Sequence, residues 1–158
     1  MTALAPVTLL LGIDPGVATG VAFYREGTLT ALQTIAPEDF AALLQRERPQ
    51  QVVLEDSRLQ SAVFVKPGLS RQAMLKVARN VGMIDGMCRD FTIACELADI
   101  PCTGISPRQK GGKLKAPYFA QITGYSKRCN QHERDAAMVA RPFRHGRQGR
   151  QRSSLGGG

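Results

Sequence analysis

The chain has 158 residues, 43% of them hydrophobic, and a net charge of +8. This length allows one domain with a hydrophobic core and excludes a protein of two lobes. No stretch approaches the roughly 20 consecutive apolar residues that cross a membrane, and no basic segment precedes the first apolar run, as it would in a signal peptide. Four cysteines without paired spacing argue against a zinc or disulfide framework, so we expect reduced thiols and a cytoplasmic protein.

Basic residues collect in three segments that contain no acid. Residues 1–56 carry seven acids and three arginines, whereas residues 57–84 carry five basic residues and residues 100–131 carry six. Five more arginines follow residue 140. The pattern favours a polyanionic partner bound beside a cluster of carboxylates, although each segment alone is also compatible with an ordinary solvated surface.

A basic tail follows the part of the chain that can build a core. Residues 142–158 are dominated by Arg, Gly, Gln and Ser, a composition that cannot bury enough apolar surface to fold. We therefore expect one folded domain over residues 1–141 and a disordered tail over residues 142–158.

The first third of the chain predicts three antiparallel strands. Residues 8–13 form an apolar run that ends at Asp14 and a Pro-Gly turn, which is typical of a strand buried on both faces. Residues 17–24 and 28–35 mix β-branched, aromatic and small residues between turns, and should fold back as the second and third strands.

A helix and a parallel strand should follow. Pro37 opens the helix with acids in its first turn, and Pro49 ends it. The apolar residues 51–54 then end at Glu55, and a strand reached through a helical crossover lies parallel to the first strand. Asp14 and Glu55 should therefore project from the same end of the sheet. When two carboxylates lie this close together, the pKa of one of them rises or the pair binds a divalent cation. An isolated Asp, by contrast, is commonly paired with a nearby Lys or Arg.

The middle of the chain predicts a basic loop and one long helix. Residues 57–69 form the loop, in which Phe64 either stacks on exposed bases or packs into the core. Ser70 is a suitable N-cap for a helix of about residues 70–98. Its apolar positions are too many for one face, so we expect one side to pack on the sheet and the other to contact a two-fold partner.

The last elements are a strand, a basic loop and two helices. Residues 100–105 should form the fifth strand, and residues 106–115 a flexible loop suited to phosphate contact. A short helix over residues 117–124 is followed by a helix over residues 130–140. His132 and Asp135 lie three apart in that last helix and so share one face, where they can bind the same metal.

Three short motifs in this order resemble the RuvC-type Holliday junction resolvases of the RNase H-like superfamily. They are residues 12–16 (Gly-Ile-Asp-Pro-Gly), residues 53–56 (Val-Leu-Glu-Asp) and residues 132–137 (His-Glu-Arg-Asp-Ala-Ala). The resemblance covers about residues 8–140 and includes the order of the elements. It implies an α/β, RNase H-like fold with a five-stranded mixed sheet, three antiparallel N-terminal strands plus parallel strands, flanked by helices.

The resemblance also implies an activity and a site. The protein would be a homodimeric, metal-dependent endonuclease that cleaves branched DNA, with the helix of about residues 70–98 at the dimer interface. Asp14, Glu55, His132 and Asp135 would be both the catalytic residues and the ligands of two Mg²⁺ ions. Asp14 would contact both ions, Glu55 one, and His132 with Asp135 the other. Carboxylate oxygens suit Mg²⁺, and the imidazole favours tolerance of Mn²⁺.

We expect DNA to be contacted by Phe64 and by basic residues from the acid-free segments. Phosphate contacts of this kind make affinity strongly dependent on salt. The expected contacts are Arg58, Phe64, Lys66, Arg71, Lys76, Arg108, Lys110, Lys113 and Lys115.

Other functions remain compatible with parts of the pattern. An ATPase of the actin or sugar-kinase type shares the turn Asp14-Pro15-Gly16 but needs two lobes. A catalytically idle DNA-binding module of the same fold is a second alternative. A third is a nuclease of this fold that acts on another branched or RNA-containing substrate.

Overall fold

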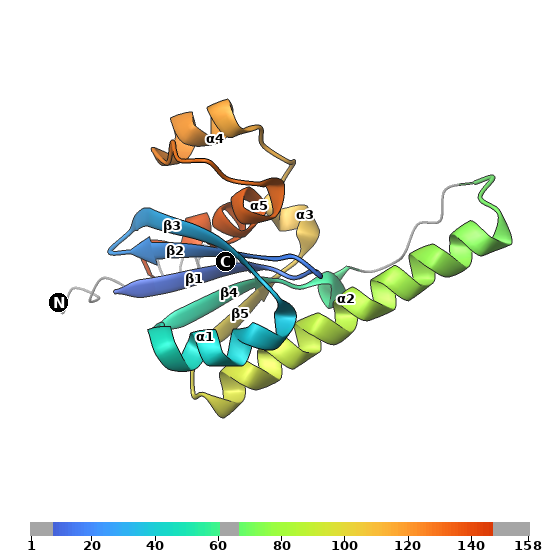
Figure 1. The fold of residues 1–158 in the computed structure, drawn as a ribbon, viewed down its shortest axis with the longest axis horizontal. Helices are drawn as coiled ribbons and strands as arrows, with labels where there is room; N and C mark the ends of the chain where they lie inside the picture. The colour runs from blue at the N-terminus through green and yellow to red at the C-terminus, as the bar shows by residue number, and fades with distance from the viewer. Residues whose placement is uncertain (1–7, 61–66, 147–158) are drawn as a thin grey trace, which may run out of the picture.

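Apolar strands build the centre of the molecule. In the computed structural model, which describes residues 8–60 and 67–146, five strands form one mixed sheet in the order β3-β2-β1-β4-β5 (Figure 1). β1 pairs antiparallel with β2 and β2 with β3, while β4 runs parallel to both β1 and β5. The expected five-stranded mixed sheet is confirmed. Its strands are β1 (Leu9–Asp14), β2 (Thr19–Arg25), β3 (Thr28–Ile35), β4 (Gln51–Glu55) and β5 (Cys102–Ile105).

Helices flank the sheet on both faces. α1 and the long helix α2 lie on one side, and α5 lies on the other with α4 beyond it (Figure 1). The α-helices are α1 (Phe40–Glu47), α2 (Arg71–Leu97), α3 (Pro107–Lys110), α4 (Ala116–Thr123) and α5 (Gln131–Ala140). Three short 3₁₀ turns complete the fold: η1 (Pro37–Asp39), η2 (Ser57–Leu59) and η3 (Arg141–Phe143).

Alternation along the strands creates a core on each face and decides where the acids point. Leu11 of β1 belongs to the core under α1 and α2, where the rings of Phe40 and Phe91 lie 4.4 Å apart between centroids. Leu10 belongs to the core under α5. Because side chains alternate, Asp14 continues the face of Leu10, so its carboxylate is directed toward α5.

Two glycines let α5 approach the sheet closely. A Cβ atom at Gly12 of β1 would overlap the carbonyl oxygen of Ala136 and lie 2.7 Å from the Cβ of Ala140. A Cβ at Gly20 of β2 would overlap the carbonyl oxygen of His132. The backbone of α5 therefore lies directly on β1 and β2, at the end of the sheet where Asp14 stands.

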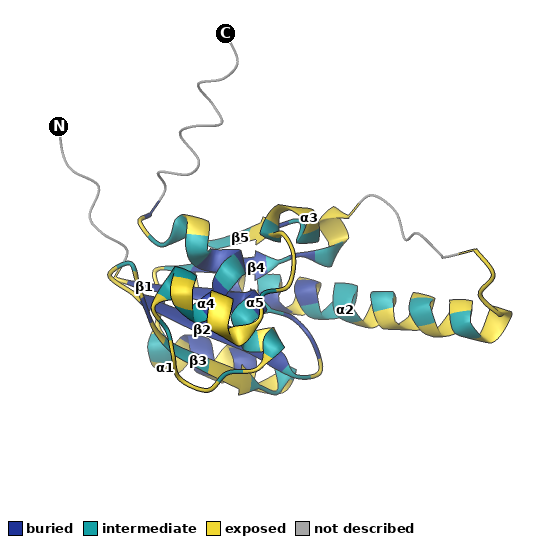
Figure 2. Ribbon diagram, turned by 90° about the horizontal axis from the view of Figure 1, so that it is seen from above, coloured by how far each residue is buried: buried dark blue, intermediate teal, exposed yellow. Residues whose placement is uncertain are grey.

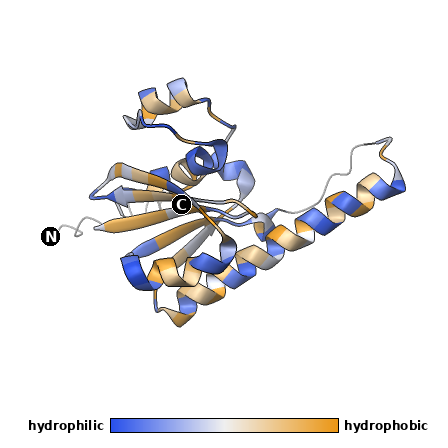
Figure 3. Cartoon of the chain, viewed as in Figure 1, coloured by the Kyte–Doolittle hydropathy of each residue, from blue (hydrophilic) through white to orange (hydrophobic). Residues whose placement is uncertain are grey.

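The C-terminal part of α2 packs against the sheet and α1. Its buried residues are Cys88, Phe91 and Cys95, while its N-terminal half projects beyond the sheet (Figures 1 and 2). Hydrophobic positions recur along the whole helix (Figure 3). The exposed large hydrophobic residues among them are Met74, Leu75, Met83, Ile93 and Leu97. A single chain leaves this apolar surface uncovered.

The structure differs from the sequence expectations in two segments. Residues 106–115 were expected as a flexible loop, but they begin with α3. Ser106 and Gln109 form a capping box there, which satisfies the free N–H groups of the first turn. The described chain also continues past the expected boundary at residue 141, through η3 to Gly146, and Phe143 packs against the core under α5. No helix within the described ranges has the length and hydropathy to cross a membrane.

Gly12→Ala should destabilise the protein by about 2–3 kcal/mol, because an added methyl group must push α5 away from β1. Urea denaturation measures the loss. Gly112→Ala, in the segment that follows α3, is the matched control, since nothing lies within 4 Å of a Cβ atom at that position. The control should not lose stability, because the added methyl group meets no neighbour and restricts only the unfolded chain. Equal stabilities of the two variants would contradict the close approach of α5.

Candidate active site

Acidic side chains from three elements converge at one end of the sheet. Asp14 ends β1 and Glu55 ends the parallel neighbour β4. The carboxyl group of Asp14 lies within hydrogen-bonding reach of Glu55 and close to the charge of Asp135 from α5. His132, also on α5, places its Nδ1 atom 3.3 Å from Oδ2 of Asp14. Asp14 therefore lies near each of the other three residues that the sequence predicts to bind metal.

Lys110 joins this cluster. Its Nζ atom lies 3.4 Å from Oε1 of Glu55 and 3.5 Å from Oδ2 of Asp135, and its side chain is only 9% exposed. We had expected Lys110 to contact DNA from a flexible loop. α3 instead turns the side chain inward, where the ammonium group offsets part of the carboxylate charge. The pattern Ser-Pro-x-Gln at residues 106–109 was the available signal, since it predicts a capped helix.

Local hydrogen bonds hold α5 in place over the strands. Asn130 and Glu133 form a capping box at its N-terminus, and both side chains also bond to Thr34 of β3. The hydroxyl group of Tyr24, on β2, donates to the carbonyl oxygen of Ala137 at 2.7 Å. These contacts tie α5 to the sheet on both sides of Asp135 and so set the register of the acidic residues.

The electrostatics of the cluster show an excess of negative charge. The pKa of Asp14 is raised to about 8, chiefly by burial and also by the neighbouring Glu55 and Asp135, while Lys110 acts in the opposite direction. A carboxyl group retains its proton under such conditions because no sufficient positive charge stabilises the ionised form.

The donor set fits a hard divalent cation. It consists of carboxylates from Asp14, Glu55 and Asp135, with the imidazole of His132 at the exposed rim. Carboxylate oxygens are the ligands that Mg²⁺ and Mn²⁺ prefer. Within the described ranges, no group of three or more His, Cys, Asp or Glu side chains has the geometry to hold a metal ion as it stands. The raised pKa of Asp14 and the inward ammonium group of Lys110 nevertheless indicate that a positive charge stabilises the carboxylates of this cluster.

Asp56 is a further acidic residue of this region, next to Glu55 in the chain, to which the sequence motif assigns no role. It is buried, and its carboxylate accepts two hydrogen bonds from the guanidinium of Arg58, at 2.9 and 2.8 Å. This pairing holds the pKa of Asp56 below its usual range. Arg58 also donates to Thr92 of α2. The guanidinium expected to contact DNA thus already has three bonds within the fold, and its contact with DNA stays a prediction.

The remaining expected DNA contacts are distributed over the surface. Phe64 and Lys66 lie outside the described residues. Five of the expected contacts on α2, α3 and the segment that follows α3 are exposed, which leaves them accessible to phosphates: Arg71, Lys76, Arg108, Lys113 and Lys115.

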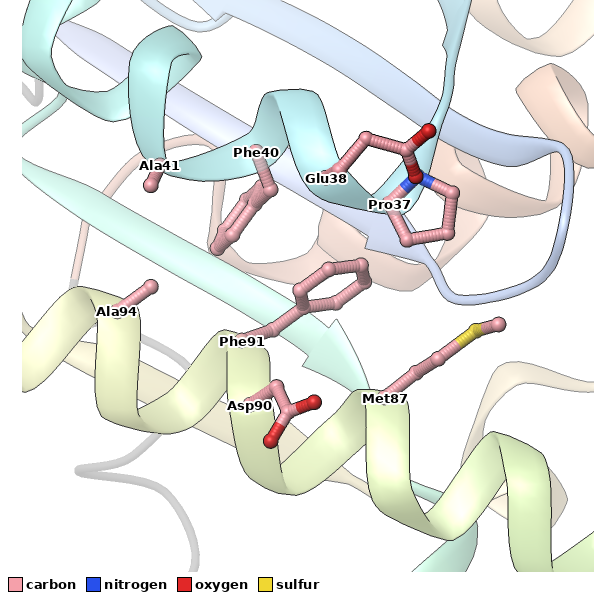
Figure 4. A pocket seen from close by; sticks show the side chains of 8 residues that line it. All are labelled: Pro37, Glu38, Phe40, Ala41, Met87, Asp90, Phe91 and Ala94. Carbon is pink, nitrogen blue, oxygen red and sulfur yellow. The ribbon is translucent and has the colours of Figure 1, made fainter.

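A groove of about 360 Å³ lies away from the acidic cluster, between α2 and the start of α1. Phe40, Met87, Phe91 and Ala94 line it, with Pro37 at its end (Figure 4). The groove is mainly apolar and belongs to the face of the sheet opposite α5, so it is separate from the candidate active site.

Comparison with known proteins identifies the fold. No family model and no curated protein matches the sequence. Among solved structures, Thermus thermophilus RuvC in complex with a Holliday junction substrate aligns with a TM-score of 0.58 and 19% identity, over 86% of this chain and 92% of that chain. The chain has the fold of RuvC. A second structure of Thermus thermophilus RuvC gives a TM-score of 0.57 and 20% identity, over 85% of this chain and 92% of that chain.

A yeast mitochondrial Holliday junction resolvase also aligns, with a TM-score of 0.46 and 14% identity, over 91% of this chain and 80% of that chain. The two alignments with RuvC, at 19% and 20% identity, establish the RuvC-like fold of this chain and its structural similarity to these resolvases. The expected family resemblance is thereby confirmed at the level of the fold.

In the absence of metal, the protein should lose stability as the pH rises from about 4 to about 8. Asp14 has a pKa of about 8 in the folded protein and an ordinary value of 3.8, so the folded state binds more protons than the unfolded state in this window. The free energy of unfolding must then fall with rising pH. The amide introduced by Asp14→Asn cannot ionise, so the free energy of unfolding of this variant should depend less steeply on pH.

Urea denaturation in a chelating buffer across this pH range measures both slopes. Asp39→Asn, an exposed site in η1, is the control and should follow the wild type. If Asp14→Asn and the wild type had identical slopes, the electrostatic description of the cluster would be wrong.

Proposed function

We propose that the protein is a metal-dependent endonuclease that cleaves branched DNA, with the four-way Holliday junction as its main substrate. The observation that carries the proposal is the meeting of Asp14, Glu55 and Asp135 at one end of a RuvC-like sheet. The structure of Thermus thermophilus RuvC was determined with a Holliday junction substrate, and the same fold with an acidic cluster supports a related activity here.

Each residue of the cluster has a distinct part in the proposed chemistry. Asp14, Glu55, Asp135 and His132 would hold the divalent cation. When bound, Mg²⁺ or Mn²⁺ activates a water molecule for phosphodiester hydrolysis and stabilises charge on the leaving oxygen. Asp14 must give up its proton for this role, because only the carboxylate form is a ligand. Lys110 keeps an ammonium group beside Glu55 and Asp135, where it can neutralise a phosphate oxygen that enters the cluster.

Exposed basic residues would provide the DNA-binding surface. Arg71 and Lys76 extend along α2, and Lys113 and Lys115 follow α3 near the acidic cluster. Phe64 and Lys66 are proposed contacts on the segment between η2 and α2. Phosphate contacts position the DNA without reading its sequence, which suits recognition of a branched shape.

We further propose that two copies associate through α2. The exposed apolar side chains of this helix, together with the apolar groove beside Phe91 and Met87, form a surface that one chain leaves uncovered. Gly82 and Gly86, four residues apart with open space around them, permit a second helix to approach. A two-fold arrangement would present two acidic clusters to one junction and so allow paired cleavage.

A catalytically idle DNA-binding protein is the second candidate. The contacts of Lys110 with Glu55 and Asp135 favour it, because an ammonium group can satisfy carboxylates that in a nuclease would bind a cation. Cleavage of DNA in the presence of metal distinguishes the two functions.

Asp14→Asn should abolish cleavage and retain junction binding, because it removes a metal ligand and leaves the basic surface unchanged. The assay uses labelled four-way, three-way and linear duplex DNA with Mg²⁺, Mn²⁺ or a chelator, and gel shift measures binding. Removal of a ligand should lower the cleavage rate by at least about 100-fold. Asp39→Asn is the control and should cleave normally.

If Asp14→Asn cleaved DNA at the wild-type rate, the assignment of the active site would be wrong. Binding of the junction by the wild type without any metal-dependent cleavage would instead favour the idle module. Preferential cleavage of a three-way or RNA-containing branch would retain the nuclease and change its substrate.

The wild type should behave in solution as a particle of about twice 17.1 kDa. Met83→Lys places a charge among the exposed apolar residues of α2 and should shift the mass to that of one chain, because burying an unpaired charge is costly. Gln33→Lys, at an exposed position of β3, should leave the mass unchanged. Light scattering coupled to gel filtration measures both variants, and a wild-type monomer at micromolar concentration would contradict the dimer.

A further inference from the structure

The two oxygen atoms of Asp135 have different partners. Oδ1 accepts a hydrogen bond of 2.8 Å from the side-chain amide of Gln131, four residues earlier on α5. Oδ2 lies 3.5 Å from Nζ of Lys110, inside the acidic cluster. Gln131 therefore holds one oxygen of the carboxylate on the surface of α5, and this leaves the other directed toward Glu55 and Asp14.

Arg134 fixes the orientation of Gln131. Its Nη2 atom donates to Oε1 of Gln131 at 3.2 Å, so the amide oxygen faces Arg134 and the amide nitrogen faces Asp135. If the amide were reversed, an N–H group would face the guanidinium and an oxygen would face the carboxylate. Arg134 thus ensures that Gln131 donates to Asp135.

The other nitrogens of Arg134 bind the chain on both sides of α4. Nε donates to the carbonyl oxygen of Leu114 and Nη1 to that of Cys129, each at 2.9 Å. These two residues enclose the segment that carries α4, which stands over α5 on the side away from the sheet (Figure 1). The guanidinium is therefore occupied by contacts within the fold.

We propose that Gln131 and Arg134 are positioning residues for Asp135, and that through them the placement of the segment 114–129 controls how well the cluster binds a divalent cation. The proposal rests on the proposed function, since it concerns the same site. All three side chains are at least partly shielded from solvent, where hydrogen bonds are stronger than in water.

The composition of the segment suggests what this connection serves. Within residues 114–129 there are three basic residues, Lys115, Lys127 and Arg128, and no acid. A DNA phosphate bound there would stabilise the segment and, through Arg134 and Gln131, the productive orientation of Asp135. Metal binding and DNA binding would then support each other.

Two variants separate the two parts of the proposal. Gln131→Met keeps the size of the side chain and removes its bond to Asp135, while the bonds of Arg134 to Leu114 and Cys129 remain. Arg134→Lys keeps the charge but cannot reach all its partners, because an ammonium group lacks the planar fork of guanidinium. Gln121→Met, at an exposed position of α4, is the matched control.

The experiment measures Mn²⁺ binding to the DNA-free protein by isothermal titration calorimetry, together with amide hydrogen exchange and thermal unfolding. Gln131→Met should weaken Mn²⁺ binding by about 10-fold or more, as is usual when a residue that orients a metal ligand is lost, with unchanged exchange in residues 114–129. Arg134→Lys should weaken Mn²⁺ binding by a similar factor and also accelerate exchange in that segment. Gln121→Met should change neither.

Wild-type affinity for Mn²⁺ in a folded Gln131→Met would overturn the positioning role. Faster exchange in Arg134→Lys with unaltered Mn²⁺ affinity would overturn the coupling to the segment. If Arg134→Lys does not fold, Gln131→Met decides the positioning role alone. If the wild type binds Mn²⁺ and cleaves DNA, and both variants match it, only this inference is refuted. If the wild type neither binds Mn²⁺ nor cleaves DNA, the proposed function is refuted.

Discussion

Repulsion among carboxylates at one end of the sheet is the constraint on which the rest of the structure depends. Asp14, Glu55 and Asp135 are held together against their mutual charge, with one positive neighbour, Lys110. Burial and the neighbouring carboxylates together raise the pKa of Asp14. Apolar packing on both faces of β1 must supply the compensating free energy. Strained or electrostatically unfavourable groups persist only where the surrounding structure over-determines them, as the two cores do here.

The close contact between α5 and the sheet turns that constraint into a defined geometry. Gly12 and Gly20 bring the helix backbone directly onto β1 and β2, and the bond from Tyr24 to the carbonyl group of Ala137 prevents the helix from sliding along its axis. With larger residues in the strands, α5 would stand farther out and Asp135 would lose its proximity to the other acids. The glycines of the first strands therefore belong to the site as much as the acids do.

Much of this arrangement was predictable from local patterns. Strands that end in acid and run parallel place Asp14 and Glu55 together, and a three-residue spacing places His132 on the face of Asp135. The inward position of Lys110 was not predicted, because the basic composition of residues 106–115 obscured the helix-capping pattern among them. Asp56 and Arg58 follow Glu55 closely in the chain and pair through a turn. The residue composition of this segment does not predict the geometry of that turn. The links from Arg134 to Leu114 and Cys129 depend on tertiary packing alone.

The projecting half of α2 has a thermodynamic consequence for a single chain. About four turns of helix, residues 71–83, precede Ile84, the first side chain of α2 that packs against the core. These turns must rely largely on intrinsic helix propensity, which is marginal in water for segments of that length. In an isolated chain these turns therefore exchange between helix and coil, and ordering them costs conformational entropy. Association through this helix is then a coupled ordering and docking event, with the large negative heat-capacity change that accompanies apolar burial.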